Sequence, residues 1–529
     1  MDLLARGETG RAVDTTRFRF AAALTGIFLV LAGVGAIRHE LWRDEMQAWL
    51  IARDVPDLGA LLEQVHYEGA PPLWILLLRP LALLTHRPEA MQLFNWVLAG
   101  ITIFVFCQFA PISRLLKVLL VANYYLLFEY GIVCRNYLPA VLFLGVACIL
   151  YPSARERPWP FCLSLVVAAM ASVHSLIVAV AIAAGFWGSW GLEAIRGKGK
   201  PDSTARGFHY PSLLAFALGV GLAVYSMLPR PDTLYVPARE WIFHWIPSRM
   251  AKVSWAFVSA HFPWPRPPGY FWIPAWDTPF PSFDDNVAFG LAFALFGGSV
   301  LLLRRHLGSL LCYLVGTLGV STFLYVKYLG FSRHTAFLFF AFLFAFWIKK
   351  TDGALRGNGF SVWSGRAAEL ALAVMLTMRA VTGLAAVRED FDRPFSCGKL
   401  SAKIIQEHHL QNAFLAVGLD WAGAPLAGYL DRSLYFPNAL RYGSYTRWET
   451  RRIDNFLLLG DEECFRRVAQ EAKGREIVLS LDHPLPAAFM QEHGIQPLAE
   501  VLGSMTPFED YYLYYIPGKP GAAATSAAF

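Results

Sequence analysis

The chain has 529 residues, of which 56% are hydrophobic and 16% are charged, and its mean hydropathy is +0.40. This composition excludes an ordinary soluble protein, in which so much apolar and aromatic mass with so little charge is rare. The net charge of +6 is small, and the basic residues lie in short loops between apolar runs. They therefore indicate membrane topology and not a nucleic-acid-binding surface.

Apolar runs long enough to cross a bilayer recur along the first three quarters of the chain. A spanning helix needs roughly 20 mainly apolar residues, because the hydrocarbon layer is about 30 Å thick and backbone polar groups must bond internally. The sequence predicts a polytopic α-helical membrane protein with about 11 spanning helices. We expect them at residues 18–37, 89–110, 115–132, 136–151, 159–173, 175–192, 211–228, 287–303, 308–326, 333–348 and 365–387.

The basic residues between these runs predict the orientation of the chain. With the N-terminus in the cytoplasm, every basic cluster between predicted spans falls on the cytoplasmic side, as the positive-inside rule requires. The opposite orientation would place all of these clusters outside. The clusters are Arg6 to Arg19, Arg114 with Lys117, Arg155 with Arg157, Arg196 to Arg206, Arg304 with Arg305, and Lys349 to Arg356.

Two large loops then face the external side, at about residues 38–88 and 229–286. The first contains a short apolar run at 71–85 that carries Pro71, Pro72 and Pro80. If this run crossed the membrane, the later loops would invert and the charge rule would fail, so we interpret it as a re-entrant or interfacial helix. The second loop is rich in proline and tryptophan, which predicts an irregular interfacial segment.

The pattern changes after the last apolar helix. Residues 1–388 form the predicted transmembrane domain, and residues 389–518 a soluble α/β domain on the external side, followed by a flexible tail at 519–529. Neither a GxGxxG nor a GxxxxGK[ST] motif occurs, so a structural or acceptor-docking module is favoured. Strands are predicted at 413–420, 456–460, 475–482 and 511–516, and helices at 401–410, 461–472 and 486–494.

The cysteines give no sign of a metal or redox motif, because no CxxC occurs among the seven. Five lie in or beside apolar helices, where a small buried side chain is the ordinary interpretation. Cys397 and Cys464 fall in the soluble domain, and a disulfide between them is left open.

Polar residues gather on the predicted external side. Asp44 and Glu45 follow the first helix, and His66 and Glu68 precede Pro71 in the same loop. Arginine should be rare in external turns, which makes four further residues conspicuous. A guanidinium at a membrane rim can grip a phosphate through two parallel hydrogen bonds, although snorkelling to the interface is an equal alternative for each residue alone. These residues are Arg135, Lys327, Arg333 and His334.

The order of these elements resembles the GT-C superfamily of membrane glycosyltransferases, in particular its protein O-mannosyltransferase and aminoarabinose-transferase-like branch. The resemblance covers roughly residues 18 to 390 and depends on short motifs. They are the acidic pair Asp44 and Glu45, the proline-rich helix start at Glu68, Pro71, Pro72 and Leu73, the Arg135-x-Tyr137 element, and Arg333 with His334.

The resemblance implies a sugar donor carried on a polyprenyl phosphate and a transfer that inverts the anomeric centre. It implies that Asp44 is the general base, with Glu45 second, and that His66 and Glu68 lie in the pocket. Donor-phosphate contacts are implied for Arg135, Tyr137, Lys327, Arg333 and His334. Glu68 matches a metal-linked glutamate, so a divalent metal held by Glu68 with His244 or His261 is left open. Gly69 and Ala70 stand where that branch has one lysine.

Three other functions remain open at this stage. A transporter or flippase for a lipid-linked glycan would need polar residues along a path through the bilayer. A polysaccharide polymerase or ligase would also bind phosphate with external arginines, and a scaffold would leave Arg135 and Arg333 unexplained. The expected location is a bacterial inner membrane, with the active site and the C-terminal domain in the periplasm and a lipid, glycan or protein as acceptor.

Overall fold

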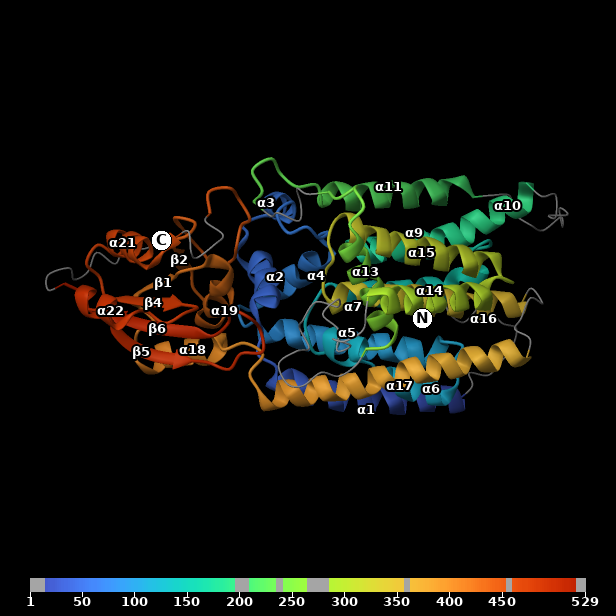
Figure 1. The fold of residues 1–529 in the computed structure, drawn as a ribbon, viewed down its shortest axis with the longest axis horizontal. Coiled ribbons are helices and arrows are strands. Elements are labelled where there is room, and N and C mark those ends of the chain that lie inside the picture. The colour runs from blue at the N-terminus through green and yellow to red at the C-terminus, as the bar shows by residue number, and fades with distance from the viewer. Residues whose placement is uncertain are drawn as a thin grey trace.

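The computed structural model describes residues 15–195, 209–234, 241–263, 285–355, 362–452 and 459–519. An elongated bundle of roughly parallel helices carries the C-terminal α/β domain at one end (Figure 1). The helices α2, α3 and α4 lie at the junction between the two parts, and α1 and α17 run along one side of the bundle. We call the end of the bundle at this junction the rim.

Helices occupy all eleven places at which spans are predicted. Six segments among the described residues are long and apolar enough to cross a membrane, at Thr15–Arg38, Glu89–Phe109, Val173–Glu193, Asp285–Leu303, Leu307–Val326 and Arg366–Asp392. The helices of the bundle are α1 (Thr15–Arg38), α5 (Glu89–Phe109), α6 (Arg114–Val121), α7 (Tyr137–Leu150), α8 (Pro158–Ala169), α9 (Val173–Ala183), α10 (Ser189–Ile195), α11 (Tyr210–Ser226), α14 (Asp285–Leu303), α15 (Leu307–Val326), α16 (Ser332–Leu355) and α17 (Val362–Asp392).

Two predicted spans are interrupted. The run at 115–132 divides into α6 and the π-helical turn η1 (Tyr125–Glu129), and the run at 175–192 contains the π-helical turn η3 (Ala184–Gly188). The 3-10 turn η2 (Tyr151–Ser153) follows α7. Such π turns insert one residue into the helical repeat and often occur at functional sites. In η1 the interruption directs the chain into the turn that carries Arg135.

The two external loops contain more helix than expected. The first holds α2 (Arg43–Asp54), α3 (Leu58–Val65) and α4 (Leu73–Leu84), and at 12 residues α4 is about 18 Å long, too short to cross the hydrocarbon layer. In the second loop, α13 (Pro247–His261) packs against α14 and α16, so this part is not irregular, whereas residues 235–240 and 264–284 lie outside the described residues. Pro247 stands in its first turn, where proline is tolerated, and the apolar residues of α13 are buried.

The C-terminal domain is an α/β fold around a six-stranded sheet of order β3-β2-β1-β4-β6-β5. Strands β2, β1 and β4 are parallel, and β3, β6 and β5 are antiparallel to their neighbours. The strands are β1 (Phe414–Val417), β2 (Leu434–Phe436), β3 (Arg441–Gly443), β4 (Ile477–Leu481), β5 (Gln496–Val501) and β6 (Tyr511–Ile516). The helices are α18 (Gly398–Glu407), α19 (Asp420–Leu430), α21 (Asp461–Ala472) and α22 (Ala487–His493).

Three predicted strands and three predicted helices of this domain match β1, β4, β6, α18, α21 and α22. The predicted strand at 456–460 lies mostly outside the described residues, as does the predicted tail. Strands β2, β3 and β5 and helix α19 are absent from the prediction, since two of the strands have three residues and α19 contains Pro425. Cys397 and Cys464 are buried free thiols in different hydrophobic clusters, so the disulfide left open does not form.

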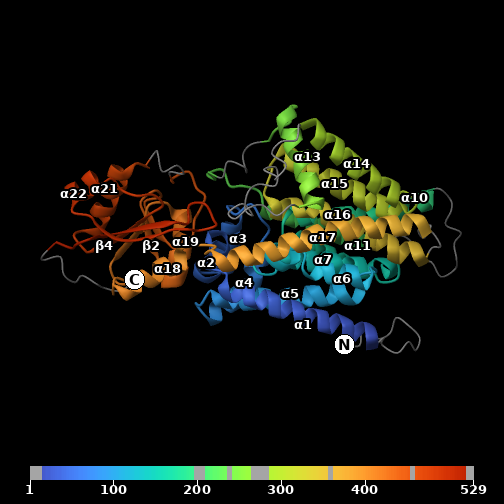
Figure 2. The same cartoon turned by 60° about the horizontal axis from the view of Figure 1, so that its bottom comes forward.

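The first external loop and the C-terminal domain share one hydrophobic core. Buried residues of α2 and α4, such as Trp49 and Leu78, belong to the same cluster as Phe436 and Leu513 of the sheet domain. The turn at this junction is fixed partly by Gly69, whose φ of 65° is a left-handed conformation that glycine tolerates well. Figure 2 shows α2, α3 and α4 between the bundle and the sheet. The predicted boundary at 388 therefore separates the chain into two segments but not into two independent cores.

Candidate active site at the rim of the bundle

Three segments far apart in the sequence meet at the rim. They are the first turn of α2, the turn between η1 and α7, and the first turn of α16. Asp44 and Glu45 lie near the N-terminus of α2, where the helix dipole favours negative charge. Arg333 lies near the N-terminus of α16, where the dipole disfavours a cation. Arg333 therefore needs an anionic partner, and the rim supplies one.

Asp44 is that partner and is shared by two arginines. Arg135 Nη1 lies 2.8 Å from Asp44 Oδ2, and Arg333 Nη2 lies 3.4 Å from the same oxygen. The Asp44 side chain is 31% exposed, whereas those of Arg135 and Arg333 are 18% and 7% exposed. Two guanidinium groups thus share one carboxylate. A second anion can therefore be attracted to this cluster.

The electrostatics of Asp44 follow from these neighbours. Burial opposes the ionisation of Asp44, but Arg135, Arg333 and Arg43 outweigh it and hold the pKa of this carboxyl below its usual value. The same carboxylate raises the pKa of Arg135 against the effect of burial. Asp44 is therefore ionised at neutral pH.

The indole of Trp42 packs against the arginines of the site. The sequence did not single out this residue. The guanidinium carbons of Arg43, Arg135 and Arg333 lie 5.3, 6.0 and 5.5 Å from the centroid of this ring. Such contacts orient a guanidinium without neutralising it. The available signal was a tryptophan two residues before Asp44.

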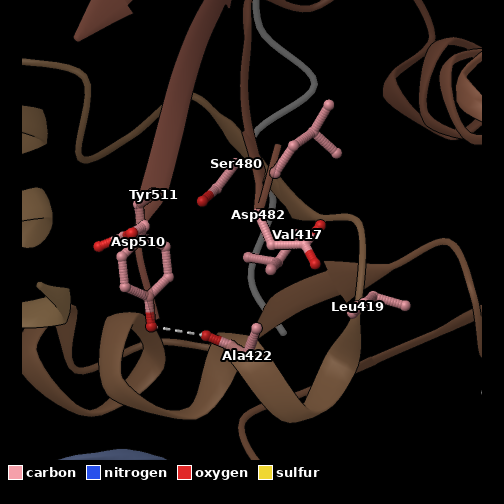
Figure 3. A pocket seen from close by; sticks show the side chains of 8 residues that line it. Val417, Leu419, Ala422, Ser480, Asp482, Asp510 and Tyr511 are labelled. Carbon is pink, nitrogen blue, oxygen red and sulfur yellow. Dashed lines mark hydrogen bonds between the residues drawn. The ribbon is translucent and has the colours of Figure 1, made fainter. Parts of the chain in front are cut away.

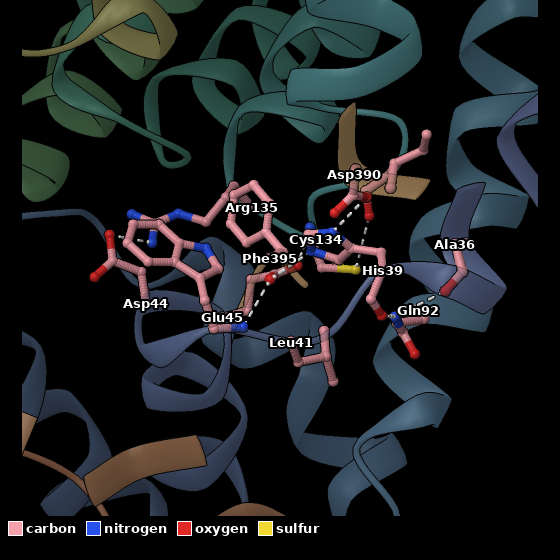
Figure 4. A network of polar contacts seen from close by, with 12 residues as sticks. Ala36, His39, Leu41, Asp44, Glu45, Gln92, Cys134, Arg135, Asp390 and Phe395 are labelled. Carbon is pink, nitrogen blue, oxygen red and sulfur yellow. Dashed lines mark hydrogen bonds and ion pairs between the residues drawn. The ribbon is translucent and has the colours of Figure 1, made fainter. Parts of the chain in front are cut away.

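Glu45 lies one residue from Asp44 but faces a different environment. Its side chain is fully buried, and Oε2 lies 2.9 Å from His39 Nε2, whose Nδ1 lies 3.0 Å from Asp390 Oδ2. Burial disfavours the charged imidazole, but Asp390 and Glu45 outweigh it and raise the pKa of His39 to about 10. We call Glu45, His39 and Asp390 the buried triad (Figure 4).

The buried triad fixes backbone on both sides of the site. Glu45 Oε2 also accepts from the N–H of Trp42 at 3.2 Å, which closes the start of α2. Glu45 Oε1 accepts from the N–H of Cys134 at 2.5 Å, directly before Arg135. The carboxylate of Glu45 is thus fully engaged, and the position favours a positioning role over the role of second base.

Glu68 is a further carboxylate of the site. Its Oε1 accepts from Gln47 Nε2 at 3.1 Å and from Gln64 Nε2 at 2.9 Å. Burial raises the pKa of Glu68 to about 7, with the charge of Asp44 acting in the same direction and the two amides and Arg135 acting against it. Glu68 therefore lies close enough to Asp44 and Arg135 to sense both charges.

Three further predicted phosphate ligands have other surroundings. Tyr137 is buried, and its ring packs against those of Tyr130 and His334. His334 Nδ1 accepts from the N–H of Phe331 at 2.8 Å, which caps the start of α16. Lys327 lies at the end of α15 with Nζ 4.4 Å from the ring centroid of Trp241. Tyr137 and His334 thus support the turns that hold Arg135 and Arg333, while Lys327 is not placed against Asp44 by any described contact.

The predicted metal ligands are dispersed. His66 Nδ1 bonds to the carbonyl of Leu228 at 2.8 Å, at the end of α11. His261 is buried among phenylalanine rings of α13 and α16, and the exposed His244 belongs to the segment before α13. Among the described residues, no group of three His, Cys, Asp or Glu side chains could hold a metal ion. The donor set that the sequence predicted around Glu68 is therefore not assembled here.

A second polar group lies at the carboxyl ends of β1 and β4 in the C-terminal domain. Ser480, Asp482 and Asp510 line a small hollow there with Val417 and Tyr511 (Figure 3). This edge of a parallel sheet is where ligands often bind. The hollow is too narrow for a water molecule, and the Tyr511 hydroxyl donates across it to the carbonyl of Ala422 at 2.9 Å. It is therefore part of the packing of the domain.

Comparison with known proteins gives a similarity of fold. No family model matches the chain, and no curated protein matches its sequence. Among solved structures, the chain is similar to the crystal structure of ArnT from Cupriavidus metallidurans bound to undecaprenyl phosphate. The identity is 11%, the match covers 93% of this chain and 97% of that one, and the TM-score is 0.47. At this level the similarity assigns no activity and no residue, so the function is inferred from the site of this chain.

Proposed function

We propose that this protein is a membrane glycosyltransferase that moves a sugar from a polyprenyl-phosphate donor to an acceptor hydroxyl at the rim. The observation that carries the proposal is the sharing of the Asp44 carboxylate by Arg135 and Arg333. A proton acceptor and two guanidinium groups thus lie at one edge of a membrane bundle. Sugar transfer from a lipid phosphate requires both groups at one place.

Asp44, Arg135 and Arg333 have different roles in the proposed reaction. The acceptor oxygen bonds to the anomeric carbon, the bond from that carbon to the phosphate oxygen breaks, and the acceptor proton passes to Asp44. Arg135 and Arg333 hold the donor phosphate and stabilise the charge that develops on it as it leaves. When Arg135 and Arg333 bind the donor phosphate, they stabilise the charge of Asp44 less. The pKa of Asp44 then rises, and Asp44 becomes a better base. Attack from the face opposite the phosphate inverts the anomeric centre.

The proposed location is a bacterial inner membrane with the rim facing the periplasm. The arginines of the rim are isolated residues that engage Asp44, whereas the basic clusters of the chain lie in the segments at the opposite end of the predicted spans. The positive-inside rule then assigns that opposite end to the cytoplasm. A polyprenyl phosphate would present its headgroup at the rim from the outer leaflet.

The test is the variant Asp44→Asn in purified protein supplied with a polyprenyl-phosphate sugar and a cell-envelope acceptor extract. We expect the rate of transfer to fall about 10³-fold, within the range for loss of a general base. The protein should still fold, because the asparagine preserves the shape of the side chain, but with a lower melting temperature, because Arg135 and Arg333 lose their anionic partner. Asp392→Asn is the matched control, since Asp392 is 58% exposed and pairs with Arg388 on the same helix, α17. Full activity of Asp44→Asn removes the assignment of the base.

A further inference from the structure

One segment of the C-terminal domain contacts α2, the helix that carries Asp44. Residues 444–452, which we call the strap, follow β3 and run over α2. One end of the strap is anchored in the domain by Arg452, whose guanidinium pairs with Asp420 at 2.7 Å, with both side chains fully buried. The other end is tied to α2, because the hydroxyl of Ser444 donates to Asp54.

The middle of the strap is held by the second external loop. The Leu234 N–H donates to the Trp448 carbonyl at 2.9 Å, the Thr450 N–H donates to the Asp232 carbonyl at 2.8 Å, and Thr233 pairs with Glu449 in an antiparallel bridge. Side chains add to this backbone pairing. Arg447 lies over the ring of Tyr67 at 4.5 Å, and the Tyr67 hydroxyl donates to Asp232 at 2.8 Å. Contacts with both external loops therefore hold the strap at the rim.

Gln47 joins the strap to Glu68. The amide of Gln47 makes a paired contact with the backbone of Thr446, donating to its carbonyl at 2.7 Å and accepting from its N–H at 2.9 Å. The same Nε2 donates to Glu68 Oε1 at 3.1 Å. Thr446 is 1% exposed, so this contact is shielded from water. An amide held at both ends by backbone has one orientation, and it presents its second hydrogen to Glu68.

We propose that the strap holds Glu68 in its working position through Gln47, so that the C-terminal domain completes the active site. The inference rests on the proposed function of that site. It makes Gln47 a positioning residue and Glu68 a polar group of the acceptor side, next to Asp44. It also gives the C-terminal domain a direct part in the reaction.

Gln64 provides a matched comparison inside the same site. Gln64 also donates to Glu68 Oε1, at 2.9 Å, but the described structure gives it no contact with the strap. Gln47→Met and Gln64→Met each remove one hydrogen bond to Glu68 and keep the length of the side chain. Only Gln47→Met also releases the strap.

The docking of the strap can be measured without the reaction. The Glu449 side chain is 16% exposed, and all seven native cysteines are buried free thiols. A Glu449→Cys substitution therefore reports the release of the strap through its rate of modification by a water-soluble maleimide. We expect slow labelling in the otherwise unchanged protein and in Gln64→Met, and labelling at least about tenfold faster in Gln47→Met, since opening exposes the thiol.

The decisive experiment combines this label with kinetics on the purified full-length protein. We expect Gln47→Met to lower kcat about tenfold more than Gln64→Met, with KM for the lipid-linked donor unchanged. Oxidation of the cysteine pair Thr233→Cys and Glu449→Cys should restore part of kcat in Gln47→Met, because paired residues of antiparallel strands are within disulfide reach. Equal kcat and equal labelling in the two methionine variants overturn the inference. Absence of sugar transfer in the unmodified protein instead overturns the proposed function, and the labelling contrast still reports the docking of the strap.

Discussion

Asp44 and Glu45 are neighbours in the sequence but belong to two different polar clusters. Asp44 is part-exposed and faces Arg135 and Arg333, whereas Glu45 is fully buried and faces His39. The first cluster has two guanidinium groups around one carboxylate and one open side. The second has one imidazole between two carboxylates and no open side. A single step along the helix, a rotation of about 100°, thus separates a carboxylate that can react from a carboxylate that holds the reacting groups in place.

This contrast predicts different losses for the two positions. Asp44→Asn should remove activity and keep the fold. Glu45→Ala should lower the free energy of unfolding by about 3 to 5 kcal/mol, because it leaves His39 charged and buried beside one carboxylate. The measurement is the melting temperature in detergent, together with the rate of transfer. Glu407→Ala, which removes an exposed carboxylate paired with Lys403, is the control and should stay within about 0.5 kcal/mol. A stable Glu45→Ala protein would contradict the role of the buried triad.

The pH dependence of stability sharpens the same comparison, with a smaller effect. His39 has a raised pKa of about 10, so its contribution is complete below about pH 6.5, the ordinary value for histidine, and is lost as the pH rises toward 10. We expect the melting temperature to fall by several degrees across this window. In His39→Gln, which is uncharged, this part of the pH dependence should disappear. A parallel decline in both proteins would show that the imidazolium is not its source.

The smallest effect is expected at a buried charge that belongs to neither cluster. Arg379 on α17 is fully buried, and its guanidinium lies over Phe339 at 3.7 Å and Tyr125 at 4.6 Å, with no carboxylate paired to it in the described chain. The cost of burying this cation roughly offsets its ring contacts. We therefore expect Arg379→Met to change the free energy of unfolding by about 1 kcal/mol or less. A loss as large as that of Glu45→Ala, measured by the same melting assay, would assign Arg379 an anionic partner.

The transmembrane part of the fold could be predicted from the sequence because its signal is local. Each apolar run carries its own evidence, and the charges between runs fix which ends lie together. This is also why Asp44, Arg135 and Arg333 could be assigned to one end before their contacts were known. Helix α13 was missed because the prolines and tryptophans of its loop obscured its apolar face. Strands β2 and β3, with three residues each, are too short for a periodic pattern.

The supporting residues of the site could not be predicted, because their partners lie far away in the chain. His39 and Asp390 are separated by 351 residues, and Gln47 and Thr446 by 399. No spacing rule connects such pairs, and neither His39 nor Gln47 stands in a motif. Glu45 is the clearest example of a residue whose role the sequence could not predict. Its place beside Asp44 suggested that both residues act as bases, but the full burial of its side chain argues against this.

The hydrophobic core shared by α2, α4 and the sheet domain sets an order for biosynthesis. The apolar faces of α2 and α4 are made early, but the strands that cover them follow more than 300 residues later. Contacts across so long a stretch of chain form slowly, and apolar surface left exposed in the interval is prone to aggregate. The nascent protein therefore keeps an unfinished surface until its last strands are in place, and a chain that stops after α17 would keep that surface permanently.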